Sequence, residues 1–314
     1  MAICLHPVYK KDGSVVPCGK CYNCRAQKRA ELVFRMEQEL KVRPVAFFVT
    51  LTYTDENLYF MSASATHRTK YKNRYGNKHF ALLEPKKVSL FLRNLQYNYR
   101  RKYNTESLVR YYLTGEYGDG THNFGEESNR PHYHCVFFLP DGLGIDKENF
   151  LSLLESVWKE GHIDIKFVNS AALNYVAKHQ LKECAGNEYQ QTYSPIFSRC
   201  SRYKGGIGSN FLTPLIKQYY LNNGPKCVIL HGRKFRLPTA YSRKIFPKKT
   251  DNQYRDFIVQ SQENYQLLLQ SENLSQYDNA ELRRRFKVLN KRKWREYYSK
   301  KFTRNYIKQS LNKK

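Results

Sequence analysis

The sequence predicts an α+β fold in which an antiparallel β-sheet carries helices on one face. Runs rich in β-branched and aromatic residues predict strands at residues 43–53, 109–116, 131–139 and 163–168. Residues 86–103 have the apolar spacing of an amphipathic helix, and Asp146 can cap a second helix that ends near Trp158. A third helix is expected at residues 170–182, with Ser170 as its N-cap. The resulting order is β-α-β-β-α-β-α.

The strand at residues 131–139 opens with two histidines, His132 and His134, one residue apart. Side chains alternate between the faces of a strand, so both imidazoles point to the same side, about 7 Å apart along the strand. With one carboxylate added, they could bind a single divalent cation. A pair of ordinary hydrogen-bonded surface histidines is the alternative.

A glutamate and a tyrosine are expected to join these histidines. The strand at residues 109–116 ends at glycine and is followed by a polar loop at residues 119–129, so a hairpin would bring Glu116 beside His132. On the third helix, positions three, four and seven apart share one face. That face carries the polar side chains of Tyr175, Lys178, His179 and Lys182.

In order and spacing, four segments resemble the HUH endonucleases that start rolling-circle DNA replication: residues 48–53, 115–118, 130–134 and 175–178. Within that class the chain resembles the replication initiators of gokushovirus-type Microviridae phages. Residues 17–25, with their closely spaced cysteines, and the glycine-rich residues 201–208 extend the resemblance, which covers roughly residues 1–245.

The resemblance implies an HUH-type sheet, split βαβ-like in plan, with the histidines opposite a helix that carries the nucleophile. It implies that Glu116, His132 and His134 hold Mg²⁺ or Mn²⁺, and that Tyr175 attacks a phosphodiester of single-stranded DNA. The products would be a 5′-phosphotyrosine link and a free 3′-hydroxyl. Lys178 or Lys182 would steady the phosphate or the developing phenolate.

Related initiators often carry a second tyrosine four residues after the first, where this chain has His179. Either one tyrosine suffices, or a distant one such as Tyr189 or Tyr193 takes part. The family also implies a single-stranded DNA origin as substrate, a host polymerase and helicase as partners, and the bacterial host cytoplasm as location. No signal segment and no run of 18 apolar residues are present, so membrane insertion is not expected.

Charge independently indicates a polyanionic partner. The chain has 54 Lys and Arg against 27 Asp and Glu, a formal charge of +27, together with 26 tyrosines that could stack on bases. Residues 283–314 hold fourteen basic side chains and one acid, Glu296. This density favours DNA contact over a merely solvated helix face. The candidate DNA contacts are Arg93, Arg100, Arg101, Arg283, Arg284 and Arg285.

Cysteines near the start form a second candidate metal site. Cys18, Cys21 and Cys24 follow one another at two-residue gaps, and Cys4 could complete a tetrahedral structural Zn²⁺ site. Free thiols buried as small apolar groups are the alternative, and the spacing leaves both open.

Other functions explain less of the sequence. A cupin needs a glutamate shortly after its second histidine, and none follows His134. A non-catalytic single-strand binder would not need Glu116, His132, His134 and Tyr175 in this order. A plasmid-type initiator, a relaxase or an HUH transposase would share the chemistry. We expect a Cys-rich segment at residues 1–42, the endonuclease core at 43–185, a family-specific extension at 186–246 and a basic helical tail at 247–314.

Overall fold

The computed structural model describes residues 4–11, 13–59, 81–118, 130–178, 188–223, 227–246, 259, 262–263, 265–267, 269–270 and 273–311. It divides into two compact units, Leu32–Ile216 and the pair of segments Met1–Glu31 and Lys217–Lys314. The loop predicted at residues 61–79 lies outside the described residues. Within the described ranges, no helix combines the length and hydropathy needed to cross a bilayer.

A five-stranded antiparallel sheet forms the centre of the Leu32–Ile216 unit, in the order β6-β3-β5-β4-β7. Its strands are β3 (Ala46–Thr52), β4 (Arg110–Tyr117), β5 (Pro131–Phe138), β6 (Ile163–Phe167) and β7 (Ser198–Cys200). The four predicted strands are therefore present, and the predicted α+β class with its HUH-type antiparallel sheet is confirmed. The edge strand β7 was not predicted.

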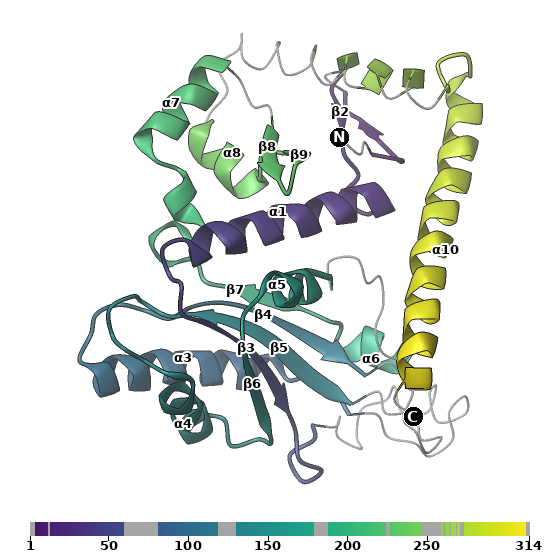
Figure 1. The fold of residues 1–314 in the computed structure, drawn as a ribbon. Coiled ribbons are helices and arrows are strands. Elements are labelled where there is room, and N and C mark those ends of the chain that lie inside the picture. Colours follow the sequence, from purple (N-terminus) through teal and green to yellow (C-terminus); the bar gives the residue numbers. More distant parts are fainter. Residues whose placement is uncertain are drawn as a thin grey trace. The chain divides into compact units, whose positions relative to one another are not determined.

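Helices cover this sheet. On one face, α3 (Pro85–Tyr103) and α4 (Lys147–Val157) pack against the core, where Phe91 and Phe150 contact Phe137 of β5. The short helix α5 (Ser170–Ala177) lies on the opposite face and contacts β5 (Figure 1). The sheet thus has an apolar face under α3 and α4 and a second face, under α5, that is free to carry polar chemistry.

Capping residues fix where α4 and α5 begin. The Asp146 side chain accepts a hydrogen bond from the Asn149 amide at 2.7 Å, as predicted. For α5 the prediction of Ser170 as N-cap was wrong, because Asn169 takes that position and accepts from the Ala172 amide at 2.8 Å. Asparagine is among the strongest N-caps, and one residue earlier its carbonyl oxygen reaches the first free amide of the helix.

The glycine-rich segment has a structural role in this unit. Glu39, fully buried, accepts hydrogen bonds from the Gly208 amide at 2.7 Å and from Arg110 of β4 at 2.9 Å. Gly206 has a φ of +81°, and a Cβ there would lie 2.8 Å from a backbone oxygen. Glycine is required for this close approach, which seals a buried carboxylate beside β4. Short elements complete the unit: α6 (Glu188–Tyr193), η2 (Tyr203–Gly205) and η3 (Ser209–Phe211).

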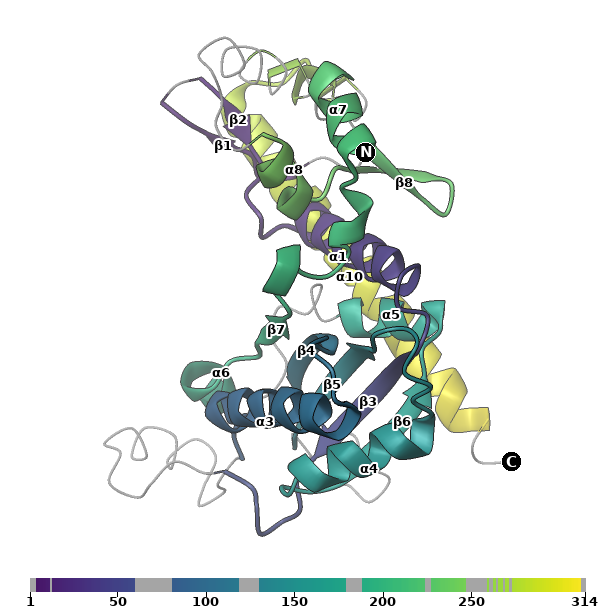
Figure 2. The ribbon, with the colours of Figure 1, turned by 90° about the vertical axis from the view of Figure 1, so that its left-hand side faces the viewer.

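The other unit is built from both ends of the chain. Its elements are β1 (Val8–Tyr9), β2 (Val15–Val16), β8 (Cys227–Leu230), β9 (Arg233–Arg236), α8 (Thr239–Ile245) and α10 (Asn279–Leu311). The helices α1 (Tyr22–Leu40) and α7 (Pro214–Asn223) contain the boundaries between the units. The β1–β2 hairpin lies near the N-terminal end of the basic helix α10 in both views (Figure 1 and Figure 2). Leu282, Phe286 and Trp294 of the predicted apolar stripe are buried.

Candidate metal centre and nucleophile

Neighbouring strands bring the predicted acid and the two histidines to one place. In the β4–β5 ladder, Glu116 lies directly opposite His132, and on β3 Thr50 lies directly opposite His134. Residues at these positions share the sheet face that lies under α5, because the alternate residues, such as Tyr133, belong to the core under α3 and α4. The hairpin that we predicted therefore forms, although residues 119–129 of its loop lie outside the described residues.

The three candidate ligands converge closely enough for one cation. Ligand atoms of Glu116, His132 and His134 all lie within 4.8 Å of one another. Glu116 and His134 are each 6% exposed, and their Oε2 and Nε2 atoms are 3.9 Å apart. A buried carboxylate is costly unless positive charge compensates it, so a cation bound here would offset its desolvation. The donors form a group that can bind a metal, and their identity does not select which one.

Hydrogen bonds orient both imidazoles. His132 Nδ1 lies 3.1 Å from the Arg130 carbonyl oxygen, which can only accept, so Nδ1 carries the proton. His134 Nδ1 lies 3.2 Å from the Thr50 hydroxyl. Both rings thus use Nδ1 for the protein and leave Nε2 for another partner, which is the arrangement that metal-binding histidines adopt.

The candidate nucleophile reaches this group from α5. That helix buries Leu173, Val176 and Ala177, whose spacing defines the side that packs down, whereas Tyr175 is 44% exposed. The Tyr175 hydroxyl nevertheless lies 3.5 Å from His134 Nε2, and the two rings meet edge to face at 5.1 Å. A phenol that is both exposed and close to the imidazole can meet a substrate from solvent.

The other residues predicted on this helix are only partly placed. Lys178 is the C-terminal cap of α5, and its Nζ lies 6.0 Å from the centre of the Tyr175 ring. Lys182 and His179 lie outside the described residues. Of the alternative tyrosines, Tyr193 ends the short helix α6, and no side-chain position is described for Tyr189. The roles assigned to all of these residues stay predictions.

The candidate DNA-binding arginines lie elsewhere in the fold. Arg93, Arg100 and Arg101 are exposed on α3, which covers the sheet face opposite to Tyr175, so the structure does not bring them to this site. On α10, Arg284 and Arg285 pair with Glu281 at 2.8 and 2.7 Å, while Arg283 is exposed. Their contact with DNA stays a prediction.

The cysteines form a separate group. Cys4, Cys18, Cys21 and Cys24 have Sγ atoms within 4.8 Å of one another, and all four are free thiols. Three of them are buried. A zinc site requires this clustering, and buried apolar thiols are compatible with it.

Sequence reasoning missed two residues that shape the metal centre. Thr50 holds His134, and Phe48 stacks on the His134 ring at 5.5 Å and meets the Tyr175 ring at 6.0 Å. Both lie on β3, inside the motif at residues 48–53 that carries part of the family resemblance. Their alternation marked one common face, but which neighbouring residues they would oppose depended on the register of the sheet.

Comparisons with known proteins agree with this arrangement. Residues 46–184, which hold all of these candidate residues, match the family model of the replication-associated protein ORF2. The chain is 26% identical to the replication-associated protein ORF2 of Spiroplasma virus 4 over 79% of its length and 73% of that protein. It is 25% identical to the replication-associated protein VP4 of Bdellovibrio phage phiMH2K, over 74% and 69% of the two chains.

A third relative, the replication-associated protein ORF4 of Chlamydia phage 1, is 20% identical over 72% of this chain and 52% of that protein. No solved structure matched the chain. The matches, together with the Glu-His-His group on an antiparallel sheet, confirm the resemblance of this chain to the rolling-circle replication proteins of small phages.

Proposed function

We propose that this chain is a phage replication initiator that nicks single-stranded DNA at the replication origin, becomes covalently joined to the 5′ end through Tyr175, and later rejoins the strand. The relatives named above are replication-associated phage proteins, which supports the initiator role. One observation carries the chemistry: the Tyr175 hydroxyl lies 3.5 Å from His134 Nε2, beside a Glu-His-His group whose ligand atoms lie within 4.8 Å of one another.

The donor set fits a divalent cation, Mg²⁺ or Mn²⁺. Glu116 would supply the oxygen ligand, and His132 and His134 would supply nitrogen through Nε2, because Nδ1 of each ring is already engaged. Bound there, the cation would polarise a non-bridging oxygen of the scissile phosphate.

The protein's own groups perform the remaining work. The Tyr175 oxygen attacks phosphorus and loses its proton, the bond between phosphorus and the 3′ oxygen breaks, and that oxygen leaves as a 3′-hydroxyl after taking a proton. One phosphodiester is exchanged for another, so the step can run backwards when a 3′-hydroxyl attacks the phosphotyrosine. Phe48 packs against both rings and restricts the approach of Tyr175 to one side of the imidazole. Lys178, next on that face, is placed to meet negative charge on the substrate.

A plasmid-type initiator, a relaxase or a transposase with the same chemistry is the second candidate. The matches to phage proteins across about three quarters of the chain favour the phage role. As an initiator, the protein would act in the bacterial host cytoplasm on a single-stranded origin and leave a 3′-hydroxyl for the host polymerase, with a host helicase separating the strands.

The test is cleavage of single-stranded oligonucleotides from the phage genome, with and without Mn²⁺, in the native protein and in Tyr175→Phe. We expect cleavage and a protein-DNA adduct with Mn²⁺ only, and no adduct with Tyr175→Phe, which still binds the oligonucleotide because the change removes one oxygen. Tyr97→Phe is the matched control, since Tyr97 is 62% exposed on α3.

Three outcomes would contradict the proposal. Cleavage that persists in EDTA would remove the metal from the mechanism. An adduct formed by Tyr175→Phe would move the nucleophile to another residue. DNA binding without any cleavage, across all oligonucleotides of the genome and with Mn²⁺ present, would make the protein a binder.

A further inference from the structure

The four cysteines near the start of the chain come from separate local structures. Cys4 precedes β1, Cys18 follows β2, and the β1–β2 hairpin between them brings these two residues together. Cys21 comes directly before α1, and Cys24 lies in its first turn. A hairpin and a helix start therefore assemble one group of thiols.

Distances within the group match a tetrahedral metal site. The four Sγ atoms lie within 4.8 Å of one another, and those of Cys4 and Cys21 are 3.9 Å apart. With Zn–S bonds of about 2.3 Å, tetrahedral geometry places two sulfur ligands roughly 3.8 Å apart. A disulfide would need about 2.05 Å. The spacing is thus that of ligands around one ion.

Backbone amides point at these sulfurs. Cys18 Sγ lies 3.4 Å from the Lys20 amide and 3.3 Å from the Cys21 amide. Cys4 Sγ lies 3.4 Å from the His6 amide and 3.2 Å from the Cys18 amide, and Cys21 Sγ lies 3.3 Å from the Leu5 amide. A neutral thiol is a weak acceptor, whereas an anionic thiolate gains from each donated bond. Five amides aimed at three sulfurs favour thiolates, which a cation would hold together.

We propose that Cys4, Cys18, Cys21 and Cys24 bind one Zn²⁺ in a closed structural site that joins the N-terminal segment and the start of α1 to the start of α10. This site is separate from the nicking centre and does not depend on the proposed nuclease activity. It uses sulfur donors alone, and with four protein ligands it leaves no position for a substrate.

The packing around the cysteines shows what such a site would hold. Leu5, Cys4, Cys21 and Cys24 share an apolar cluster with residues from further along the chain: Tyr265, Leu269, Leu274, Leu282 and Phe286. This cluster is small, and in a small core a metal supplies stability that apolar burial alone does not.

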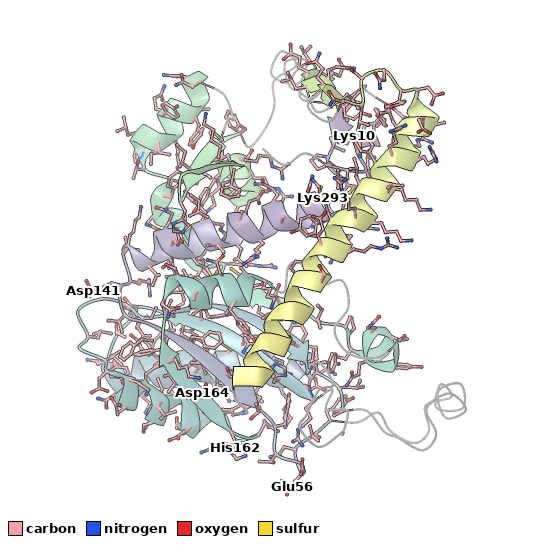
Figure 3. All side chains as sticks on the ribbon, turned by 45° about the vertical axis from the view of Figure 1, so that its right-hand side comes forward. Lys10, Glu56, Asp141, His162, Asp164 and Lys293 are labelled. Atoms are coloured by element: carbon pink, nitrogen blue, oxygen red, sulfur yellow. The ribbon has the colours of Figure 1, made fainter. Side chains whose placement is uncertain are left out.

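Polar and aromatic contacts continue the same junction along α1 and α10. The Tyr22 amide donates to Asn290 Oδ1 at 3.0 Å, and the Tyr22 ring meets Trp294 edge to face at 5.2 Å. Lys293 lies beside the first turn of α1 (Figure 3), where its Nζ is 3.4 Å from Asn23 Oδ1. Zinc loss would therefore loosen the basic helix as well as the cysteine segment.

The experiment measures metal in the purified full chain. To empty the nicking centre, the chain carries His132→Ala and His134→Ala, and zinc is counted by mass spectrometry of the metal. We expect one zinc per chain, and after exchange for Co²⁺ the visible and near-ultraviolet bands of a tetrahedral tetrathiolate. A chain purified without zinc that takes up none when Zn²⁺ is added, or Co²⁺ bands without thiolate character, would overturn the proposal.

A cysteine variant and a chelator complete the test. Cys21→Ser should lose the zinc, whereas Cys227→Ser, a matched change at a partly buried cysteine of β8, should keep it. Because Cys21→Ser could fail to fold, thermal unfolding of the unaltered chain is also followed while a tight zinc chelator is added. We expect unfolding at a lower temperature and recovery on adding Zn²⁺. Equal zinc in both variants, or a chelator that extracts zinc without lowering the unfolding temperature, would contradict a structural site at these cysteines.

Discussion

Two clusters in this chain can hold a metal, and they are assembled in opposite ways. Glu116, His132 and His134 stand on paired strands, so the sheet ladder fixes their separation before any ion arrives. The four cysteines stand on a hairpin, a turn and a helix start, with one ligand, Cys4, fourteen residues before the next, Cys18. Few backbone hydrogen bonds hold that second arrangement, since β1 and β2 have two residues each.

This difference assigns different consequences to metal loss. A site built on a preformed sheet can lose its ion and keep its fold, so the metal there serves chemistry. A site whose ligands are held mainly by one another needs the ion to stay assembled, so the metal there serves stability. The donor atoms agree: nitrogen and oxygen with an exposed tyrosine alongside in the first cluster, sulfur alone in the second.

The largest effect is expected from removing one ligand of the sheet site. His134→Ala should abolish metal-dependent cleavage, because the residue lies between Glu116 and Tyr175, while circular dichroism shows an unchanged fold. His162→Ala is the control, since His162 is exposed (Figure 3) and does not belong to the ligand group. Equal loss in both variants would mean that the effect is not specific to the metal centre.

Selective chelation separates the two clusters directly. Brief exposure to EDTA should stop cleavage at once but leave the unfolding temperature nearly unchanged, because Mg²⁺ or Mn²⁺ exchanges readily from nitrogen and oxygen ligands. A tight zinc chelator, supplied with excess Mn²⁺, should lower the unfolding temperature instead. Calorimetry and the cleavage assay on the same samples measure both. If each chelator affected stability and activity together, the two clusters would not be independent.

A smaller effect is expected from the residue that orients His134. Thr50→Val keeps the shape of the side chain but removes the hydroxyl that lies 3.2 Å from Nδ1, so Mn²⁺ affinity should fall by about 10–100-fold. Thr52→Val is the matched change on the same strand face, where the hydroxyl contacts the His162 carbonyl instead. Titration with Mn²⁺ measures both variants, and the same affinity for both would exclude a positioning role for Thr50.

The smallest change in chemistry, though a measurable change in binding, should come from α10. Arg283, Lys287, Lys291 and Arg295 are exposed at four-residue spacing, and replacing them with glutamine spares the buried stripe. Each lost phosphate contact should lower the slope of log affinity against log salt by about 0.7 on single strands. Glutamine at Arg93, Arg100 and Arg101 of α3 is the comparison. An unchanged slope in the α10 variant would make that face merely solvated.

Sequence patterns predicted the parts of the fold that depend on local periodicity. Alternation placed His132 and His134 on one face, and the glycine at the end of β4 predicted the hairpin that sets Glu116 opposite His132. The apolar spacing in α3 predicted its buried side, with Val88, Phe91, Leu92 and Leu95 all inside.

What the sequence did not show depends on partners far along the chain. Thr50 holds His134 only because β3 pairs with β5 in one register, 84 residues apart. The three residues of β7 are too few for a pattern, and their pairing with β4 makes them a strand. Likewise, Cys4 joins the other cysteines through the β1–β2 hairpin, and the cysteine spacing left its participation open.

Mapping the protein-DNA adduct tests the central claim most directly. After reaction with a single-stranded origin oligonucleotide and Mn²⁺, the protein is digested and the peptide that carries nucleotide is identified by mass spectrometry. We expect the 5′-phosphate on the peptide that contains Tyr175, bound to its phenolic oxygen. An adduct on Tyr189, Tyr193 or any other residue in the folded, metal-loaded protein would contradict the account.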